Sequence, residues 1–153
     1  MLVSKKDISI INEFLIKHLS TYVVYIFGSA IKDTTRIDSD IDIAFLCESP
    51  SNAYNNFILA QTLAAQLKRD VDLIDLRQAT TVLQMQIIAN GYIILSKDEK
   101  KRAFFEMLVY KNYAKLNEER APVLDRIKES KSIYAKWYNI KQSTFRYQVF
   151  TFY

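Results

Sequence analysis

The most informative part of this sequence is FGSAIKDTTRIDSDID, residues 27–42, with Gly28 and Ser29 near its start and Asp40 and Asp42 at its end. The whole chain has only 2 glycines, where average usage would give about 11. A chain so poor in glycine keeps it where a side chain does not fit. Gly28 therefore marks a special backbone position.

Residues 27–42 join two predicted strands. The sequence YVVYIF at 22–27 is β-branched and aromatic and predicts a buried strand that Gly28 ends, and IDIAFLC at 41–47 predicts a second. A helical turn that begins at Ser29 presents free backbone N–H groups, which favour phosphate. Glycine permits close approach of the backbone, and the serine hydroxyl adds a donor. Gly28 and Ser29 are therefore candidate phosphate-binding residues.

Asp40 and Asp42 are two residues apart at the start of a strand, so their carboxylates share one face. Two like charges this close repel each other unless a cation lies between them. Ligands that are all oxygen favour Mg²⁺, which takes substrate phosphates as remaining ligands. Asp72, in VDLIDL at 71–76, is the preferred third carboxylate of a two-metal site, and Asp75 is expected to be a strand-end or capping group. Phosphate-binding residues and metal carboxylates together indicate phosphoryl or nucleotidyl transfer.

The rest of the chain alternates helical and strand patterns. Predicted helices cover 7–19 (with Ser4 as candidate N-cap), 53–68, 80–89, 98–119 and 123–137, and predicted strands cover 22–27, 41–47, 71–76 and 92–95. Asn90-Gly91 is expected to end the third helix as a C-cap, and Pro122 to lie in the first turn of the last. The fold class is therefore α/β (α+β), a small mixed β-sheet with flanking helices.

We expect a single domain over residues 1–138, with a catalytic core at about 8–96 and C-terminal helices at about 98–138. An aromatic, basic tail follows at 139–153; it adds a strand, docks on a partner or is dispensable. The longest apolar run is 22–27, far short of the ~20 residues of a membrane helix, so no membrane contact is expected. One cysteine makes no internal disulfide, which favours a reducing cytoplasm.

Gly28-Ser29, ten residues and Asp40-Ile41-Asp42 together resemble the signature of the DNA polymerase β-like nucleotidyltransferase superfamily, and residues 28–42 resemble its small members, the minimal nucleotidyltransferases (MNT). VDLIDL at 71–76 and NGYIIL at 90–95 also match, so the resemblance covers about residues 8–120. It implies a polymerase β-like fold and a nucleoside triphosphate held with two Mg²⁺ ions, with Asp40, Asp42 and Asp72 as catalytic and metal residues.

Three further residues are candidates for the nucleotide site because of their place in the same stretch. Lys32 and Arg36 either contact the phosphates or are solvated loop cations. Ser39 either orients Asp40 or caps the turn. Net charge is +4, and the cations beyond residue 126 are read as a solvated face, so nucleic acid is not an expected partner.

The resemblance also implies a function. Small members of the family are antitoxins encoded beside an HEPN-domain ribonuclease toxin, and some AMPylate a tyrosine of that toxin. We therefore expect an adenylyltransferase that moves AMP from ATP to a tyrosine of a cognate HEPN toxin and forms a hetero-oligomer with it. Two alternatives are an antitoxin that neutralises by binding alone and a nucleotidyltransferase acting on a small molecule. The set of Asp40, Asp42 and Asp72 favours the enzyme, and about 55 residues after Leu95 leave little room for a small-molecule domain.

Overall fold

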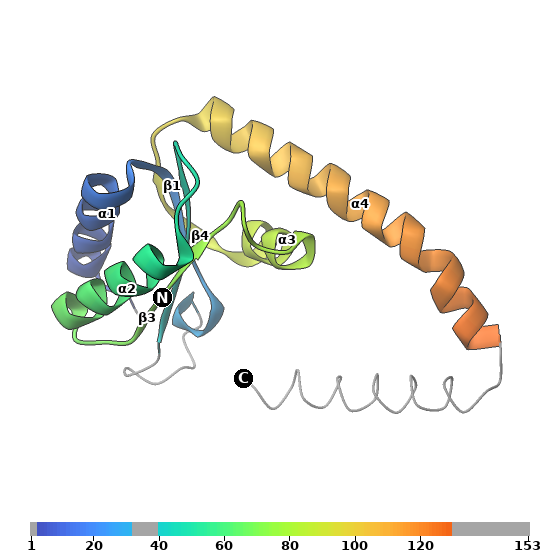
Figure 1. The fold of residues 1–153 in the computed structure, drawn as a ribbon, viewed down its shortest axis with the longest axis horizontal. Coiled ribbons are helices and arrows are strands. Elements are labelled where there is room, and N and C mark those ends of the chain that lie inside the picture. The colour runs from blue at the N-terminus through green and yellow to red at the C-terminus, as the bar shows by residue number, and fades with distance from the viewer. Residues whose placement is uncertain (1–2, 32–39, 130–153) are drawn as a thin grey trace. The chain divides into compact units, whose positions relative to one another are not determined.

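The alternation of helices and strands produces a four-stranded sheet with helices on both faces. The structure, a computed structural model, describes residues 3–31 and 40–129 (Figure 1). The elements are α1 (Lys5–Leu19), β1 (Thr21–Phe27), the 3₁₀ turn η1 (Gly28–Ile31), β2 (Ile41–Cys47), α2 (Ala53–Leu67), β3 (Val71–Asp75), α3 (Thr81–Asn90), β4 (Tyr92–Ser96) and α4 (Glu99–Glu129). The chain divides into two units, Met1–Tyr110, which holds the sheet, and Lys111–Tyr153, which is helical as far as residue 129.

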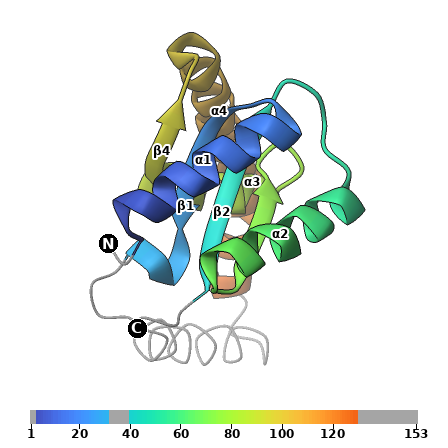
Figure 2. The same ribbon diagram turned by 90° about the vertical axis from the view of Figure 1, so that its left-hand side faces the viewer.

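The sheet has the strand order β3-β2-β1-β4. The central strand β1 runs antiparallel to both β2 and β4, and β3 runs parallel to β2. Helices α1 and α2 cover one face and α3 lies on the other (Figures 1 and 2). Each face has its own apolar cluster, one centred on Ile11, Leu15 and Ile43 and the other on Tyr25, Leu46 and Ile87. The predicted mixed α/β architecture is confirmed.

Side-chain caps fix where the first three helices begin. Ser4 accepts a hydrogen bond from the backbone N–H of Asp7, and the Asp7 carboxylate accepts one from the Ser4 N–H, which makes a complete capping box. Helices α2 and α3 have simpler caps, in which the side-chain oxygens of Asn52 and Thr80 each accept one backbone N–H hydrogen bond. The predicted cap at Ser4 is confirmed, and α1 begins two residues before its predicted start.

The prediction of two C-terminal helices is wrong. A single helix, α4, runs from Glu99 to Glu129 and contains Pro122 in its interior. Proline removes one helical hydrogen bond and disfavours this position. However, no glycine stands near it to end the helix, and Ala, Leu, Glu and Arg on both sides favour continuation. The predicted helix end at Trp137 and the tail lie outside the described residues.

Gly91 ends α3, as predicted, but not in the left-handed conformation usual for a C-cap glycine. Its φ is −74°, and its backbone N–H donates to the Ile87 carbonyl over 2.7 Å. A Cβ at this position would lie 2.4 Å from the same carbonyl oxygen. The lack of room for a Cβ, and not an unusual backbone conformation, therefore explains why residue 91 is glycine. The left-handed caps are instead Ser20 and Lys68, after α1 and α2.

Among residues 3–31 and 40–129, no helix combines the length and the apolar composition that crossing a bilayer requires.

Candidate active site

Gly28 and the Asp42 carboxylate meet where β1 ends and β2 begins. The antiparallel register pairs Phe27 with Asp42. Gly28 has φ +70°, and a Cβ built on it would lie 2.0 Å from Asp42 Oδ2. The position therefore demands glycine twice, once for its left-handed backbone and once for the space that the carboxylate occupies. Gly28 and Asp42 therefore lie next to each other at adjacent strand ends.

Asp72 joins Asp42 through the parallel register, which places the two residues directly opposite each other on β3 and β2. Ala44 and Leu46, which follow Asp42 at period two, lie in the apolar cluster that includes Ile87 of α3. Both carboxylates therefore project on the α3 face of the sheet. Asp40, just before β2, is exposed to solvent.

These carboxylates interact electrostatically. Burial raises the pKa of Asp42, and the negative charges of Asp72 and Asp40 raise it further. A raised carboxyl pKa means that the surroundings disfavour the ionised form. A bound cation would reverse that preference, because it lies between the charges that now repel one another.

The donor set fits a hard divalent cation that keeps part of its water shell. All three candidate groups supply oxygen, which is what Mg²⁺ prefers. Within residues 3–31 and 40–129, no three His, Cys, Asp or Glu side chains are grouped so that they could hold a metal ion together. The assignment of Asp40, Asp42 and Asp72 as metal ligands therefore stays a prediction.

Asp75 has a structural environment that distinguishes it from Asp72. It is buried, and its carboxylate accepts hydrogen bonds from the Ser51 N–H (3.2 Å), the Ser51 hydroxyl (2.8 Å), the Arg77 N–H (3.0 Å) and Gln78 Nε2 (3.0 Å). The Ser51 bonds tie the end of β3 to the segment that leads into α2, and the other two hold the turn that follows β3. The predicted strand-end role of Asp75 is confirmed.

The remaining predicted nucleotide contacts are only partly described. Ser29 lies half-buried in η1, directly after Gly28. Lys32, Arg36 and Ser39 lie outside the described residues, so their predicted contacts with the nucleotide stay predictions.

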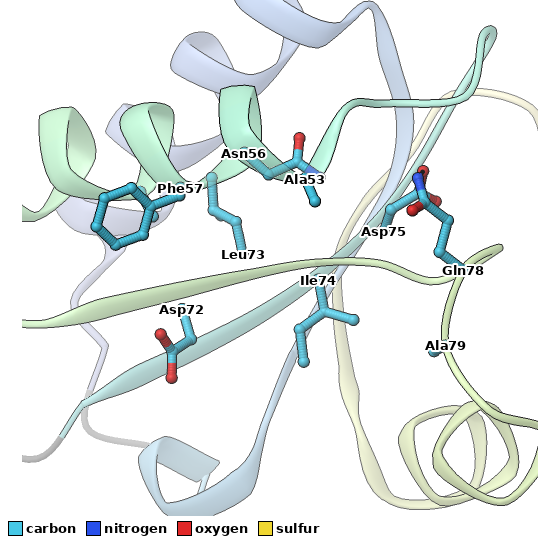
Figure 3. A pocket seen from close by; sticks show the side chains of 10 residues that line it. Ala53, Asn56, Phe57, Asp72, Leu73, Ile74, Asp75, Gln78 and Ala79 are labelled. Atoms are coloured by element: carbon cyan, nitrogen blue, oxygen red, sulfur yellow. Dashed lines mark hydrogen bonds between the residues drawn. The ribbon is translucent and has the colours of Figure 1, made fainter.

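A cavity of about 300 Å³ borders Asp72 along β3 and the N-terminal half of α2. Figure 3 shows Phe57 on the α2 side of this cavity and Asp72 pointing to the other side of β3. Phe57 is 59% exposed. The sequence did not single it out, because an aromatic residue in an apolar helix is normally expected in the core. The exposed ring of Phe57 in the cavity that Asp72 also borders makes Phe57 a candidate functional residue, and only the structure reveals it.

Comparisons with known proteins agree with this geometry. The family described as polymerase beta, nucleotidyltransferase matches residues 9–100. The protein adenylyltransferase MntA of Shewanella oneidensis is 35% identical over 105 residues, which cover 69% of this chain and 75% of MntA.

Solved structures show the same fold. A toxin–antitoxin crystal structure with AMP-PNP matches with TM-score 0.71 and 32% identity, covering 78% of this chain and 97% of the matched chain. A tri-AMPylated Shewanella oneidensis HEPN toxin in complex with MNT antitoxin matches with TM-score 0.70 and 30% identity, covering 83% and 98%. The resemblance inferred from residues 28–42 is thereby confirmed, and the chain belongs to the polymerase beta nucleotidyltransferase family, among the relatives of the MNT antitoxins.

Proposed function

We propose that this protein transfers AMP from ATP to a tyrosine hydroxyl of a partner HEPN toxin and thereby neutralises the toxin. The observation that carries the proposal is the meeting of Gly28, Asp42 and Asp72 at one end of the sheet. These three residues meet in a chain that is 35% identical to a protein adenylyltransferase. One structurally similar toxin–antitoxin structure contains the ATP analogue AMP-PNP, and another contains an AMPylated HEPN toxin. Both support ATP as the AMP donor and the toxin as the acceptor.

We assign Asp40, Asp42 and Asp72 as ligands of two Mg²⁺ ions, and Gly28, Ser29, Lys32, Arg36 and Ser39 as contacts of the triphosphate. The raised pKa of Asp42 supports this assignment, because the site favours a compensating positive charge. Bound magnesium would offset the charge of the reacting phosphates and make the attacking hydroxyl more acidic.

The chain's own residues then account for the transfer. A tyrosine hydroxyl has a pKa near 10, so it needs a base, and Asp72 on the edge strand takes its proton. The phenol oxygen forms a bond to the α-phosphorus of ATP. The bond from that phosphorus to the oxygen bridging to the β-phosphate breaks, and pyrophosphate leaves. Gly28 and Ser29 at the turn hold the departing phosphates.

We further propose that residues 1–138 work as one nucleotidyltransferase domain in the cytoplasm and that the toxin docks mainly on α4. This helix exposes several large apolar side chains, among them Phe104, Met107 and Tyr110. A docked toxin brings its own acceptor to Asp72. An AMP group on the toxin adds negative charge where RNA phosphates would bind, which explains neutralisation.

The test is mass spectrometry of a cognate HEPN toxin after incubation with this protein, ATP and Mg²⁺. We expect AMP on a toxin tyrosine, release of pyrophosphate, and loss of both with Asp42→Asn. The opposite outcome is a toxin neutralised equally by wild type and Asp42→Asn with no change in its mass. That result would establish neutralisation by binding alone.

A further inference from the structure

The cavity beside Asp72 runs along a sheet edge that has no partner strand within the described residues. β3 is the outer strand of the order β3-β2-β1-β4. Four consecutive residues of β3, from Asp72 to Asp75, line the cavity, together with α2 residues and the turn after β3. Figure 3 shows Asp72 and Ile74 pointing to one side of β3, and Leu73 and Asp75 to the other. Since both sides contribute, the cavity follows the edge of the strand. We call it the β3 edge groove.

The backbone of this edge can accept another strand. The Ile41 N–H donates to the Asp70 carbonyl, and the Leu76 N–H donates to the Phe45 carbonyl. These bonds show that even-numbered residues of β3 direct their backbone groups toward β2, so odd-numbered residues direct theirs outward. The Asp75 carbonyl is occupied by the Gln78 N–H. The outward N–H and C=O of Leu73 have no hydrogen-bond partner among residues 3–31 and 40–129.

The chemistry of the groove argues against a nucleotide as its occupant. Its ten lining residues include two carboxylates, Asp72 and Asp75, and no Lys, Arg or His. Without a bound cation, a triphosphate placed there would meet only negative charge, and the phosphate-binding turn at Gly28 and Ser29 is not part of the lining. An uncharged peptide could form backbone hydrogen bonds with the unpaired groups of Leu73 and apolar contacts with the ring of Phe57.

We infer that the β3 edge groove is the acceptor subsite, in which an extended segment of the toxin adds to β3 as a further strand. This inference rests on the proposed function. Alternate side chains of an added strand point to opposite faces. One residue therefore lies on the same side as Asp72, where its hydroxyl reaches the base, and its two neighbours lie on the side of Phe57. Leu73 thus sets the register, and Phe57 contacts the residues flanking the modified tyrosine.

Hydrogen exchange tests the strand addition without depending on catalysis. The toxin is mixed with the Asp42→Asn variant, and amide exchange is followed by mass spectrometry across residues 71–76. We expect the Leu73 amide to exchange quickly in the free protein and to be protected in the complex. A complex that forms with no change at Leu73 overturns the inference. Protection that appears without toxin, as the concentration of this protein rises, would assign the edge to a second copy and also overturn it.

A pair of variants on one helix tests the side-chain part. Phe57→Asp places a charge in the groove, whereas Tyr54→Asp changes a residue of α2 that is 74% exposed and outside the lining. For Phe57→Asp we expect the KM for toxin to rise about tenfold, with kcat changed less than about twofold. We expect Tyr54→Asp to match wild type, and ATP binding without toxin to be unchanged in both variants. Equal KM values for toxin in the two variants overturn the inference. Absence of AMP transfer by wild type would instead refute the proposed function, and the hydrogen-exchange experiment would then decide whether the toxin binds in the groove.

Discussion

Replacing Gly28 by alanine tests the contact on which the candidate site depends. Two costs arise from the structure. The left-handed backbone at φ +70° costs about 1–2 kcal/mol for a residue with a Cβ. The new Cβ would also stand 2.0 Å from Asp42 Oδ2 and 3.0 Å from its Cγ, so the carboxylate must leave its position, which costs about 0.5–1.5 kcal/mol if it moves off its rotamer. We expect the free energy of unfolding to fall by about 1.5–3.5 kcal/mol, which lowers Tm by roughly 3–14 °C in a chain of this size.

A double-mutant cycle separates the two costs. Asp42→Ala removes Oδ2 and Cγ and leaves only its Cβ, 3.5 Å from the new methyl group, which is ordinary contact. In that background Gly28→Ala should cost only the backbone term of about 1–2 kcal/mol. The coupling energy between the two positions should therefore be about 1 kcal/mol. Any effect of alanine on the unfolded chain is the same in both backgrounds and cancels.

The assay is urea denaturation of the four proteins in a buffer that contains a metal chelator, with Tm as a second readout. Nucleotide binding by Gly28→Ala should also be lost, because the displaced carboxylate and the turn that begins at Gly28 both belong to the proposed site. A cost of Gly28→Ala that is the same in both backgrounds would show that Asp42 does not fill this space. The proposed meeting of phosphate turn and carboxylate would then be wrong.

Three further outcomes are expected. Burial and the charges of Asp72 and Asp40 raise the pKa of Asp42, so the folded protein without metal holds this proton more tightly than the unfolded chain. The contribution of Asp42 to stability should therefore fall as pH rises from about 4, the ordinary Asp pKa. Urea titrations should show Asp42→Asn more stable than wild type at neutral pH, with the difference shrinking toward pH 4, and AMP-transfer assays should show it inactive. Asp75→Ala should lower the free energy of unfolding by roughly 2–4 kcal/mol, because it leaves several donors unpaired; unchanged Tm would contradict that bonding. Ser29→Ala should weaken ATP binding by about 1–3 kcal/mol with unchanged Tm, as calorimetry would measure.

Local signals in the sequence were sufficient for most of the sheet. Strand β2 has the predicted bounds of Ile41 to Cys47, because an apolar, β-branched run stands between two turn-forming segments. Alternation along β3 also places Asp72 and Asp75 on opposite faces of the strand, which predicts different environments for the two carboxylates. Such short-range patterns carry information because side-chain direction in a strand has a period of two.

The failures have different physical causes. Pro122 is equally compatible with a helix start and with a helix interior that tolerates one lost hydrogen bond, and its immediate neighbours do not decide between the two. The glycine at 91 is required by a carbonyl in the preceding turn of its own helix, which a conformational rule for C-caps does not take into account. The pairing of Asp42 with Asp72 depends on a parallel register set through the α2 crossover, so no local pattern specifies it.

The space shared by Gly28 and Asp42 also restricts the order in which the two positions can change during evolution. A lineage that first loses the carboxylate at 42 gives up that ligand and leaves room for a side chain at 28. The opposite order passes through an intermediate that is both strained and inactive, and selection removes it. A relative that carries a larger residue in place of Gly28 is therefore expected to have lost its counterpart of Asp42 already. Glycine at this position, beside an intact carboxylate, then marks a chain still selected for transfer.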